Sequence, residues 1–463
     1  MTDTTYKVRV FKTEVRKNPA GKATSYRVQW QTDGRKIWRK SFPLAAQAET
    51  YRSALITAAR NGEAFSLVTG EPVSWSRTRT QEMTWYAFLC KYVDMKWKGA
   101  SANYRQVIAR ALTAATPAMY TTQKGKPDDK ALRSALHRYA FNTQQRETAT
   151  GDVATTLKWL ADHSKPISAL TDSGLMRDVL DKATSTVAGT RAAPNTVRKH
   201  RLIVSNALDY AVELKLLDNN PLKTLNWKPP KSTYEVDRAS VINHAQARQL
   251  LDAVRQQQPS GPRLVAFFAV MYYAGLRPEE AVNLRTDNVI LPDLKEGEEE
   301  GWGELHFRKA APYAGREWTD TRTIREERSL KHRPDGHSRT VPTPPALTAI
   351  LRAHLTEFPN GPNNRIFFGV RGNELSQVTY RRAWSAARTQ ALTPAQSDSA
   401  LAKRPYDLRH ACVSTWLNAG VPATQVALWA GHSVEVLLRI YAKCVTGQDA
   451  VARQRIAEAL TAD

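Results

Sequence analysis

Residues 429–441 begin with Trp-Ala-Gly-His-Ser and end with Tyr441, which lies nine residues after His432. Two earlier stretches each contain an arginine among other charged residues. Residues 274–280 read Ala-Gly-Leu-Arg-Pro-Glu-Glu, and residues 404–410 read Arg-Pro-Tyr-Asp-Leu-Arg-His. Each stretch alone is consistent with an ordinary helix end or core position. All three occur in one half of the chain, in a fixed order, and are best interpreted together.

The ordered set resembles the tyrosine recombinase (phage integrase) family. That family has an arginine in a Gly-Leu-Arg-x-x-Glu box, a hairpin lysine, a His-x-Leu-Arg-His box, a Gly-His box and a tyrosine nine residues later. In this chain the matching residues are Arg277, Glu280, Lys331, Arg409, His432 and Tyr441. The resemblance covers the C-terminal half, and residues 330–333 and 442–444 look most like integrases of actinobacterial integrative elements.

The resemblance implies cleavage of a DNA strand, and the chemistry explains the residue types. Arg277 and Arg409 would bind the phosphodiester, because guanidinium groups bind phosphate oxygens in pairs and stay charged. Tyr441 would attack the phosphorus and hold the 3′ phosphate covalently, which leaves a 5′-hydroxyl free to attack later. Because that bond conserves the energy for rejoining, the resemblance implies no metal and no other cofactor.

Three other residues would assist this reaction. Lys331 would give a proton to the leaving 5′-oxygen. His432 would hydrogen-bond a phosphate oxygen or orient Tyr441, and Glu280 would fix the region around Arg277 and the hairpin by hydrogen bonds. Lys309, at the end of an earlier strand, competes with Lys331 for the proton-donor role. The Arg-Thr-Val-Pro sequence at residues 339–342 favours Lys331.

The chain departs from the family at Tyr406, where the family usually has a histidine. A phenol has an ordinary pKa of about 10 and cannot act as an acid or base near neutral pH as imidazole can. We expect Tyr406 to donate a hydrogen bond to phosphate instead. The alternative is that His410 takes up part of the role, although the family's second histidine usually packs behind Arg409.

The N-terminal segment, residues 1–68, reads as a small basic domain. Alternating strands are expected at residues 6–11, 25–30 and 36–42, with a hairpin at Asp33 and Gly34, followed by a helix at 45–61. Within residues 1–50 there are eleven Lys/Arg and four Asp/Glu. This sheet is predicted to bind DNA, with an adaptor domain of solvated basic residues as the alternative. The candidate DNA-contacting residues are Arg27, Trp30, Arg35 and Trp38.

Residues 82–226 are predicted to form a helical core-binding domain, with Thr84 as a helix N-cap. A helix is expected from Pro194 to Leu214, with Val197, Leu202, Val204, Leu208 and Val212 as its core stripe. Its candidate DNA-contacting residues are Arg198, Lys199 and Arg201, although an ordinary solvated face explains any one of them. The catalytic domain follows at 236–463, with Asn243 as an N-cap.

Composition agrees with a DNA-binding protein. The 67 Lys+Arg exceed the 44 Asp+Glu by 23 charges, which indicates a polyanionic partner. The three cysteines, Cys90, Cys412 and Cys444, form no paired motif, which fits a reducing cytoplasm and neither a disulfide framework nor a zinc site. The sequence contains no run of eighteen apolar residues, so no membrane span is expected.

The predicted fold is mainly α, with three domains. These are a three-stranded sheet with one helix, a helical core-binding domain, and a mostly helical catalytic domain with a small antiparallel sheet. The family resemblance implies an integrase that acts on double-stranded DNA attachment sites as a homotetramer, exchanging a C-terminal tail, with accessory DNA-bending or excision factors. It also implies a prokaryotic protein that associates with the nucleoid. A type IB topoisomerase-like enzyme and an inactive DNA-binding regulator of the same fold are the alternatives.

Overall fold

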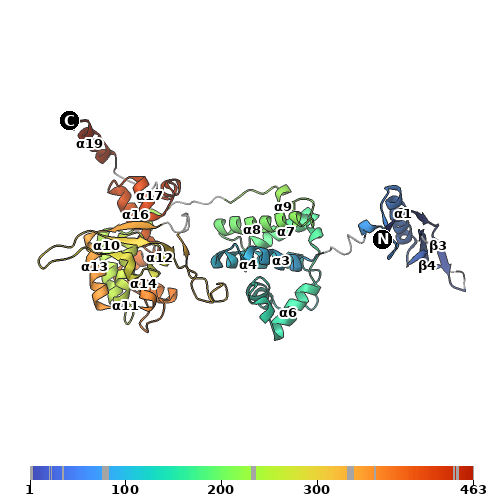
Figure 1. Ribbon diagram of the computed structural model, residues 1–463, viewed down its shortest axis with the longest axis horizontal. Helices are drawn as coiled ribbons and strands as arrows, with labels where there is room; N and C mark the ends of the chain where they lie inside the picture. The colour runs from blue at the N-terminus through green and yellow to red at the C-terminus, as the bar shows by residue number, and fades with distance from the viewer. Residues whose placement is uncertain are drawn as a thin grey trace. The chain divides into compact units, whose positions relative to one another are not determined.

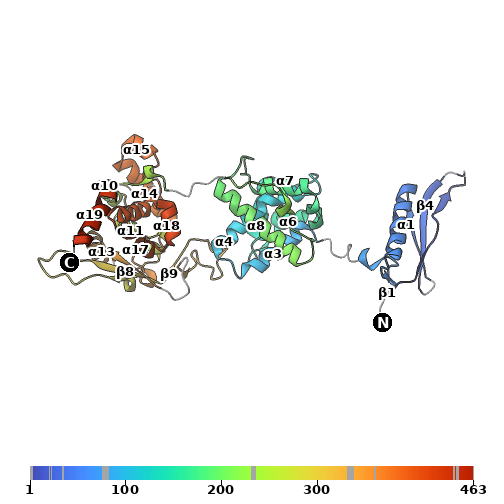
Figure 2. The ribbon, with the colours of Figure 1, turned by 90° about the horizontal axis from the view of Figure 1, so that it is seen from above.

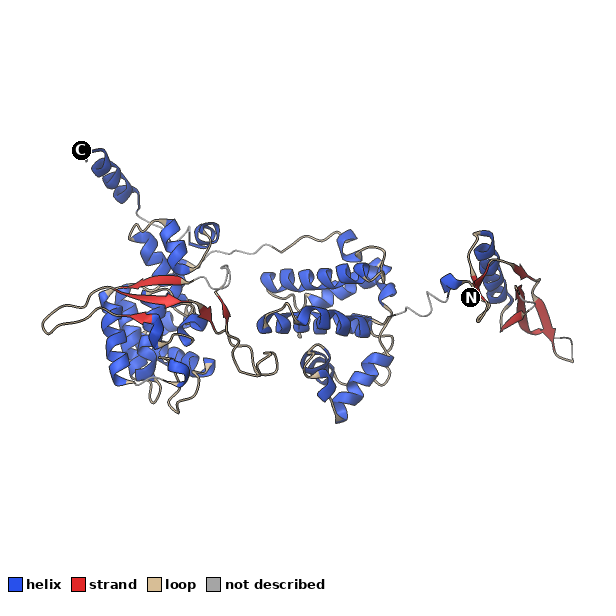
Figure 3. Cartoon of the chain, in the orientation of Figure 1, coloured by secondary structure: helices blue, strands red, loops and turns tan. Residues whose placement is uncertain are grey.

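The computed structural model describes residues 4–19, 21, 23–33, 36–75, 83–230, 236–330, 338–358, 361–441, 444 and 448–461. The chain forms two compact units. One contains Met1–Lys98 and Ile108–Lys228, and the other contains Gly99–Val107 and Pro229–Asp463. Helices dominate both units, and the strands are short (Figures 1 and 3). The mainly α fold predicted from the sequence is confirmed.

The N-terminal segment is a small sheet with one helix on one face (Figure 3). Its strands are β1 (Thr4–Thr5), β2 (Val8–Val10), β3 (Glu14–Lys17), β4 (Ala23–Thr32), β5 (Ile37–Phe42) and β6 (Phe65–Ser66), and its helix is α1 (Ala45–Arg60). Long β4 pairs with β5 along one edge and with both β2 and β3 along the other. The strands expected at residues 6–11, 25–30 and 36–42 correspond to β2, β4 and β5, and β3 is a fourth strand of this sheet that was not predicted, while β1 and β6 pair separately.

Successive side chains of β4 point to opposite faces of the sheet, and this alternation decides which of them pack against α1. Val28 and Trp30 are buried with α1, while Arg27 lies on the opposite, helix-free face. Trp38 pairs directly with Trp30 in the β4–β5 register and packs on the same core. Trp30 is 3% exposed and its indole N–H donates to the carbonyl of Gly70. Trp30 is therefore a core residue and Trp38, half-buried, packs against the same core, whereas Arg35 lies outside the described residues.

Residues 83–98 and 108–228 form a helical bundle, to which α4 contributes from Ile108 onward. Its α3, α4, α7 and α8 are seen from two directions in Figures 1 and 2. Its α-helices are α3 (Trp85–Trp97), α4 (Ala102–Ala115), α5 (Asp129–Ala135), α6 (Gly151–Asp162), α7 (Ser173–Ala183), α8 (Pro194–Glu213) and α9 (Pro221–Thr224). The predicted cap is present, because the Thr84 hydroxyl accepts a hydrogen bond from the Ala87 N–H. Val197, Val204 and Leu208 of α8 are buried as predicted. Leu202 is not, because it is 58% exposed.

The C-terminal unit surrounds one apolar helix. Helix α11 (Gly261–Tyr273) is buried on nearly every side by its neighbours α10, α13 and α16. The other helices of the unit are α10 (His244–Arg255), α12 (Pro278–Val282), α13 (Pro345–Glu357), α14 (Gln377–Ala391), α15 (Pro394–Asp398), α16 (Asp407–Asn418), α17 (Ala423–Ala430), α18 (Val434–Tyr441) and α19 (Gln448–Thr461). Asn243 caps α10 through a capping box, as expected.

The strands of this unit form two antiparallel arrangements. They are β7 (Val289–Ile290), β8 (Gly303–Phe307), β9 (Lys309–Ala310), β10 (Arg328–Ser329) and β11 (Arg339–Thr343). The order β11-β8-β7 gives the predicted small antiparallel sheet, and β9 pairs with β10 as a separate ribbon. Among the described residues, no helix combines the length and apolar character that a bilayer span requires.

Candidate active site

Four separate elements bring Arg277, Arg409, His432 and Tyr441 together. Arg277 precedes α12, Arg409 lies in the first turn of α16, His432 follows α17, and Tyr441 ends α18. A hydrogen bond of 2.9 Å joins Nη2 of Arg409 to Nε2 of His432. The His432 and Tyr441 rings lie 6.1 Å apart between centroids. Residues separated by more than 160 positions in the sequence therefore share one site.

The carboxylate of Glu280 connects the arginines of this site to strand β11 through hydrogen bonds and ion pairs. Its carboxylate accepts hydrogen bonds from the backbone N–H and Nη1 of Arg277, at 2.9 and 2.8 Å. It also accepts two hydrogen bonds from Arg339 on β11, at 2.9 and 2.8 Å. Nη1 of Arg409 lies 3.9 Å from the same carboxylate. Arg339, to which the sequence reading gave no role, is thus part of the buried centre.

Electrostatics keep Glu280 ionised. Burial alone would raise the pKa of its carboxyl, but the charges of Arg339 and Arg277 outweigh burial and hold that pKa well below its usual range. Glu280 and Arg339 are both 2% exposed. Three buried guanidinium groups therefore surround one carboxylate, which leaves an excess of two positive charges at the centre.

Backbone carbonyls at helix ends hold the cations that Glu280 does not neutralise. Arg409 donates to the carbonyls of Gly275, after α11, and Ala430, at the end of α17. Arg277 donates to the carbonyl of Gly431 at 2.9 Å. The last carbonyls of a helix have no partners within it and carry partial negative charge, so they favour cations.

Gly431 is required by the geometry of this turn. Its φ of +62° lies in the left-handed region, and a Cβ atom there would lie 2.5 Å from Nη1 of Arg339. Glycine therefore lets the end of α17 approach the buried arginines closely.

The hydrogen bond from Arg409 fixes the tautomer of His432. Since arginine can only donate, Nε2 of His432 accepts and the ring proton sits on Nδ1. Burial, followed by the charges of Arg409 and Arg277, lowers the pKa of His432 to about 2. Nδ1 is buried and has no hydrogen-bond partner among the described residues, and Nε of Arg409 is in the same state. Both are donors without an acceptor.

Tyr441 is buried, at 1% exposure, and its hydroxyl oxygen lies 2.9 Å from Nδ1 of His410. Burial raises the pKa of the Tyr441 phenol, although the charge of Arg409 acts against this. His410 also contacts Tyr406, with ring centroids 5.1 Å apart. The three rings form a row beside the arginine centre.

A basic pocket of about 750 Å³ adjoins the site in the C-terminal unit, and Tyr406, Pro278 and Glu279 form part of its wall. Five cationic side chains also line this pocket, with Glu279 as the carboxylate among its lining residues. The cations are Arg325, Arg328, Arg381, Lys403 and Arg404. A surface of this charge favours a polyanion.

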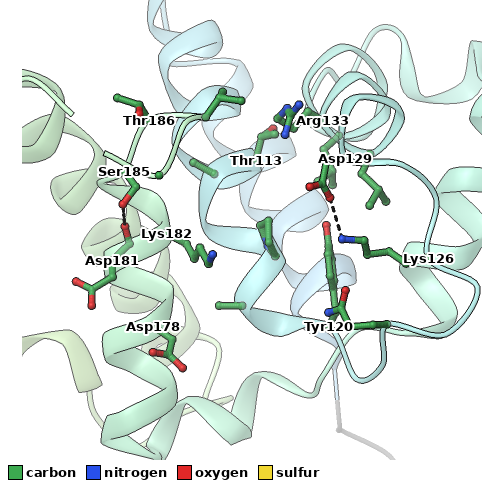
Figure 4. Close-up of a pocket in the computed structure, with 18 residues that line it drawn as sticks. Thr113, Tyr120, Lys126, Asp129, Arg133, Asp178, Asp181, Lys182, Ser185 and Thr186 are labelled. Carbon is green, nitrogen blue, oxygen red and sulfur yellow. Dashed lines mark hydrogen bonds and ion pairs between the residues drawn. The ribbon is translucent and has the colours of Figure 1, made fainter. Parts of the chain in front are cut away.

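A second pocket, of about 660 Å³, lies within the helical bundle and is charge-balanced (Figure 4). An ion pair of 2.9 Å joins Lys126 to Asp129 across its wall, and the Ser185 hydroxyl donates to the backbone carbonyl of Asp181. Three carboxylates and three cations line it, namely Asp129, Asp178, Asp181, Lys126, Arg133 and Lys182. This balance gives it no preference for phosphate.

The other candidate residues have different settings. Lys331 lies outside the described residues. Lys309 on β9 pairs with Glu327 at 3.9 Å and is exposed. On α8, Lys199 is exposed, whereas the Arg201 guanidinium stacks on Trp227 at 4.4 Å. Among the described residues, there is no cluster of three or more His, Cys, Asp or Glu side chains that could bind a metal ion.

Comparison with known proteins finds no matching family model and no matching curated protein. Solved structures with similar folds include a Tn1549 transposon integrase variant in complex with transposon right-end DNA (12% identity, 82% of this chain and 100% of that chain, TM-score 0.46). Others are XerH recombinase bound to a palindromic difH substrate (12%, 77% and 95%, TM-score 0.41) and a lambda integrase dimer bound to a COC′ core site (12%, 91% and 91%, TM-score 0.44). All three are integrases or recombinases.

Proposed function

We propose that this chain is a tyrosine site-specific DNA recombinase that cleaves and rejoins DNA strands through a covalent 3′-phosphotyrosine at Tyr441. One observation carries the proposal: a buried centre with two excess positive charges lies beside a buried tyrosine. A buried charge excess is costly unless an anion offsets it. A phosphodiester supplies that anion, and its negative charge grows as a nucleophile attacks.

The centre has the donors that this transition state needs. The unpartnered Nδ1–H of His432 and Nε–H of Arg409 gain an acceptor when a phosphate oxygen arrives. Arg277 lies at the same centre, and Tyr406 lines the basic pocket next to it. As the Tyr441 oxygen bonds to phosphorus, the bond to the 5′-oxygen breaks, and Lys331 protonates that oxygen. Rejoining reverses these steps with a 5′-hydroxyl as the nucleophile, so no external energy source is needed.

DNA-binding surfaces are proposed outside the centre as well. The helix-free face of the N-terminal sheet carries four arginines. One lies on β4, and the other three pair with β4 residues at even spacing from it, which point to the same face. The four are Arg9, Arg16, Arg27 and Arg39. This face replaces Trp30 and Trp38 as the proposed arm-type contact. Lys199 and Arg198 on α8 are the proposed contacts of the core-binding domain.

The assembly is proposed to be a homotetramer on two duplex attachment sites, since two duplexes with two cleavage points each need four tyrosines. Helix α19 is the proposed exchange tail, and its Ile456 and Leu460 are exposed. Domain exchange between copies buries such apolar side chains. Accessory DNA-bending or excision factors are further proposed partners, in a prokaryotic cytoplasm.

A suicide substrate tests the proposal, because a nicked site loses its 5′-hydroxyl fragment and traps the covalent adduct. The wild-type chain should form an adduct that protease digestion removes. Tyr441→Phe should bind the same DNA and form no adduct, whereas the matched control Tyr406→Phe should still form one, more slowly. An adduct with Tyr441→Phe would overturn the assignment.

The topoisomerase-like alternative predicts a different behaviour on plasmids. A monomeric relaxing enzyme would remove supercoils from a plasmid that has no paired attachment sites. The recombinase should leave such a plasmid supercoiled and should exchange strands only between two sites.

A further inference from the structure

His410 contacts the hydroxyl that the proposed mechanism uses as its nucleophile. It follows Arg409 in α16, and its Nδ1 lies 2.9 Å from the Tyr441 hydroxyl oxygen. We propose that His410 is the general base that removes the phenol proton as Tyr441 attacks the phosphodiester. This inference rests on the proposed function and assigns to His410 a catalytic role in place of the packing role that the family resemblance implies.

Hydrogen-bonding capacity distinguishes His410 from the other groups near Tyr441. Arg277 and Arg409 can only donate. His432 already uses its lone pair at Nε2 to accept from Arg409, so its free position is a donor. Tyr406 is itself a phenol and carries no nitrogen lone pair. Among the described residues around the hydroxyl, His410 is the side chain that offers a nitrogen lone pair to it.

The protonation state of His410 suits this role. Burial lowers the pKa of His410 to about 4, so the ring is neutral at neutral pH and has one nitrogen that accepts. With the ring proton on Nε2, Nδ1 accepts from the phenol. Several charges face the ring: Asp407 raises its pKa, while Arg409 and Arg404 lower it. Asp407, which is 1% exposed, would stabilise the imidazolium that forms.

The proposed step balances in protons and electrons. The phenol proton moves to Nδ1 of His410 while the Tyr441 oxygen bonds to phosphorus. The electron pair of the breaking P–O bond goes to the 5′-oxygen, which takes a proton from Lys331. Because a phenol is far less acidic than an imidazolium ion, the transfer is favourable only as the new bond to phosphorus forms. In rejoining, the imidazolium returns its proton to the departing tyrosine oxygen.

Two substitutions separate a base from a group that merely positions the phenol. Removing a general base typically costs about 10²–10⁴-fold in rate. His410→Ala should therefore slow cleavage of the suicide substrate by a factor in that range, with unchanged DNA affinity. His410→Asn keeps an acceptor oxygen near the place of Nδ1 but cannot carry the proton, so it should be similarly slow. Full activity of His410→Asn would overturn the assignment in favour of positioning.

A more acidic nucleophile gives a second readout that a structural role would not change. Fluorinated tyrosine at position 441 has a lower phenol pKa and needs less help from a base. It should accelerate cleavage by His410→Ala at least tenfold more than it accelerates cleavage by the parent chain. An equal effect in both backgrounds would overturn the inference.

The matched control is His244→Ala. His244 is also a histidine whose Nδ1 faces a tyrosine hydroxyl, that of Tyr272 at 3.4 Å, in the same unit. Its loss should leave the cleavage rate unchanged. Cleavage by His410→Ala at or above the parent rate would show that the hydrogen bond only restrains Tyr441. If the parent chain forms no adduct at all, the proposed function fails instead, so the two failures are distinguishable.

Discussion

Replacing Glu280 by glutamine tests the buried charge centre most directly. The substitution keeps the shape of the side chain but removes the negative charge that faces Arg277, Arg339 and Arg409. It also places an amide N–H₂ group where an oxygen now accepts from a guanidinium group. Four hydrogen bonds of 2.8–2.9 Å end on this carboxylate. Because Glu280 is 2% exposed, water does not replace the partners that are lost.

The expected loss is large because the pair is buried. Removing one partner of a buried ion pair costs about 3–5 kcal/mol, since the other charge stays buried without compensation. For a unit of this size, that loss lowers the melting temperature by about 6–20 °C. The proper readout is urea unfolding of the full chain followed by hydrogen exchange in peptides from α12 and β11, which report on this unit alone.

Glu435→Gln provides the control, because Glu435 is 84% exposed and pairs with Arg439 at 3.6 Å on the surface of α18. An exposed pair of this kind contributes less than about 1 kcal/mol. Sulfate should stabilise Glu280→Gln more than it stabilises this control, because an anion can replace part of the missing charge. If Glu280→Gln unfolds within about 1 kcal/mol of the parent chain, the reasoning about the centre is wrong.

Three further predictions follow from the same site. Lys331→Ala should slow cleavage far more than Lys309→Ala, and a 5′-bridging phosphorothiolate should rescue only the former, because its leaving group needs no proton; equal defects would reject Lys331. Gly431→Ala should unfold the site and abolish cleavage, since its Cβ would lie 2.5 Å from a buried guanidinium nitrogen at a φ of +62°; a stable, active variant would contradict this. Burial lowers the pKa values of His410 and His432 to about 4 and about 2, so between pH 6.5 and 5 the unfolded chain binds protons that the folded chain does not. The free energy of unfolding, measured in urea, should therefore decrease as the pH is lowered, by up to about 1.4 kcal/mol per pH unit for each ring. A flat profile would refute the conclusion that these rings are buried and neutral.

The resemblance of the ordered motifs to a known family selected the residues that the structure brings together. Arg277, Arg409, His432 and Tyr441 come from elements far apart in the chain, yet their residue types match one reaction. The caps Thr84 and Asn243 could also be read directly, because capping depends on local hydrogen bonds. Features governed by local chemistry or by a reaction's requirements were therefore accessible without coordinates.

Features that depend on which face a side chain occupies were less accessible. The aromatic residues Trp30 and Trp38 suggested a DNA surface, but both lie on the helix side of the sheet. Alternation along β4 separates Trp30, two residues from Val28, from Arg27, one residue from it. The face of Trp38 depends on its pairing with Trp30 across the hairpin, which the sequence does not specify. The prediction that Leu202 belongs to the core stripe is wrong for a similar reason. One step along a helix turns a side chain by about 100°, and Ile203 takes the buried position.

Arg339 and the hydroxyl partner of Tyr441 could not be derived from spacing. Arg339 reaches Glu280 because β11 pairs with β8 and passes the end of α17, and this depends on the tertiary arrangement. The histidine box contains two candidate proton carriers, Tyr406 and His410. Only the packing of α16 against α18 shows which of the two lies 2.9 Å from the nucleophile.

The way the arginines are held also explains how the centre keeps its charge. A second carboxylate would have stabilised Arg409 more strongly than the carbonyls of Gly275 and Ala430 do, but it would have neutralised the centre. Carbonyls at helix ends satisfy the N–H groups of a guanidinium with partial charges only. The fold can therefore bury Arg277 and Arg409 and still leave a net positive charge for an incoming phosphodiester. On this reasoning, the turns that end α11 and α17 are as necessary to the proposed reaction as the side chains that they hold.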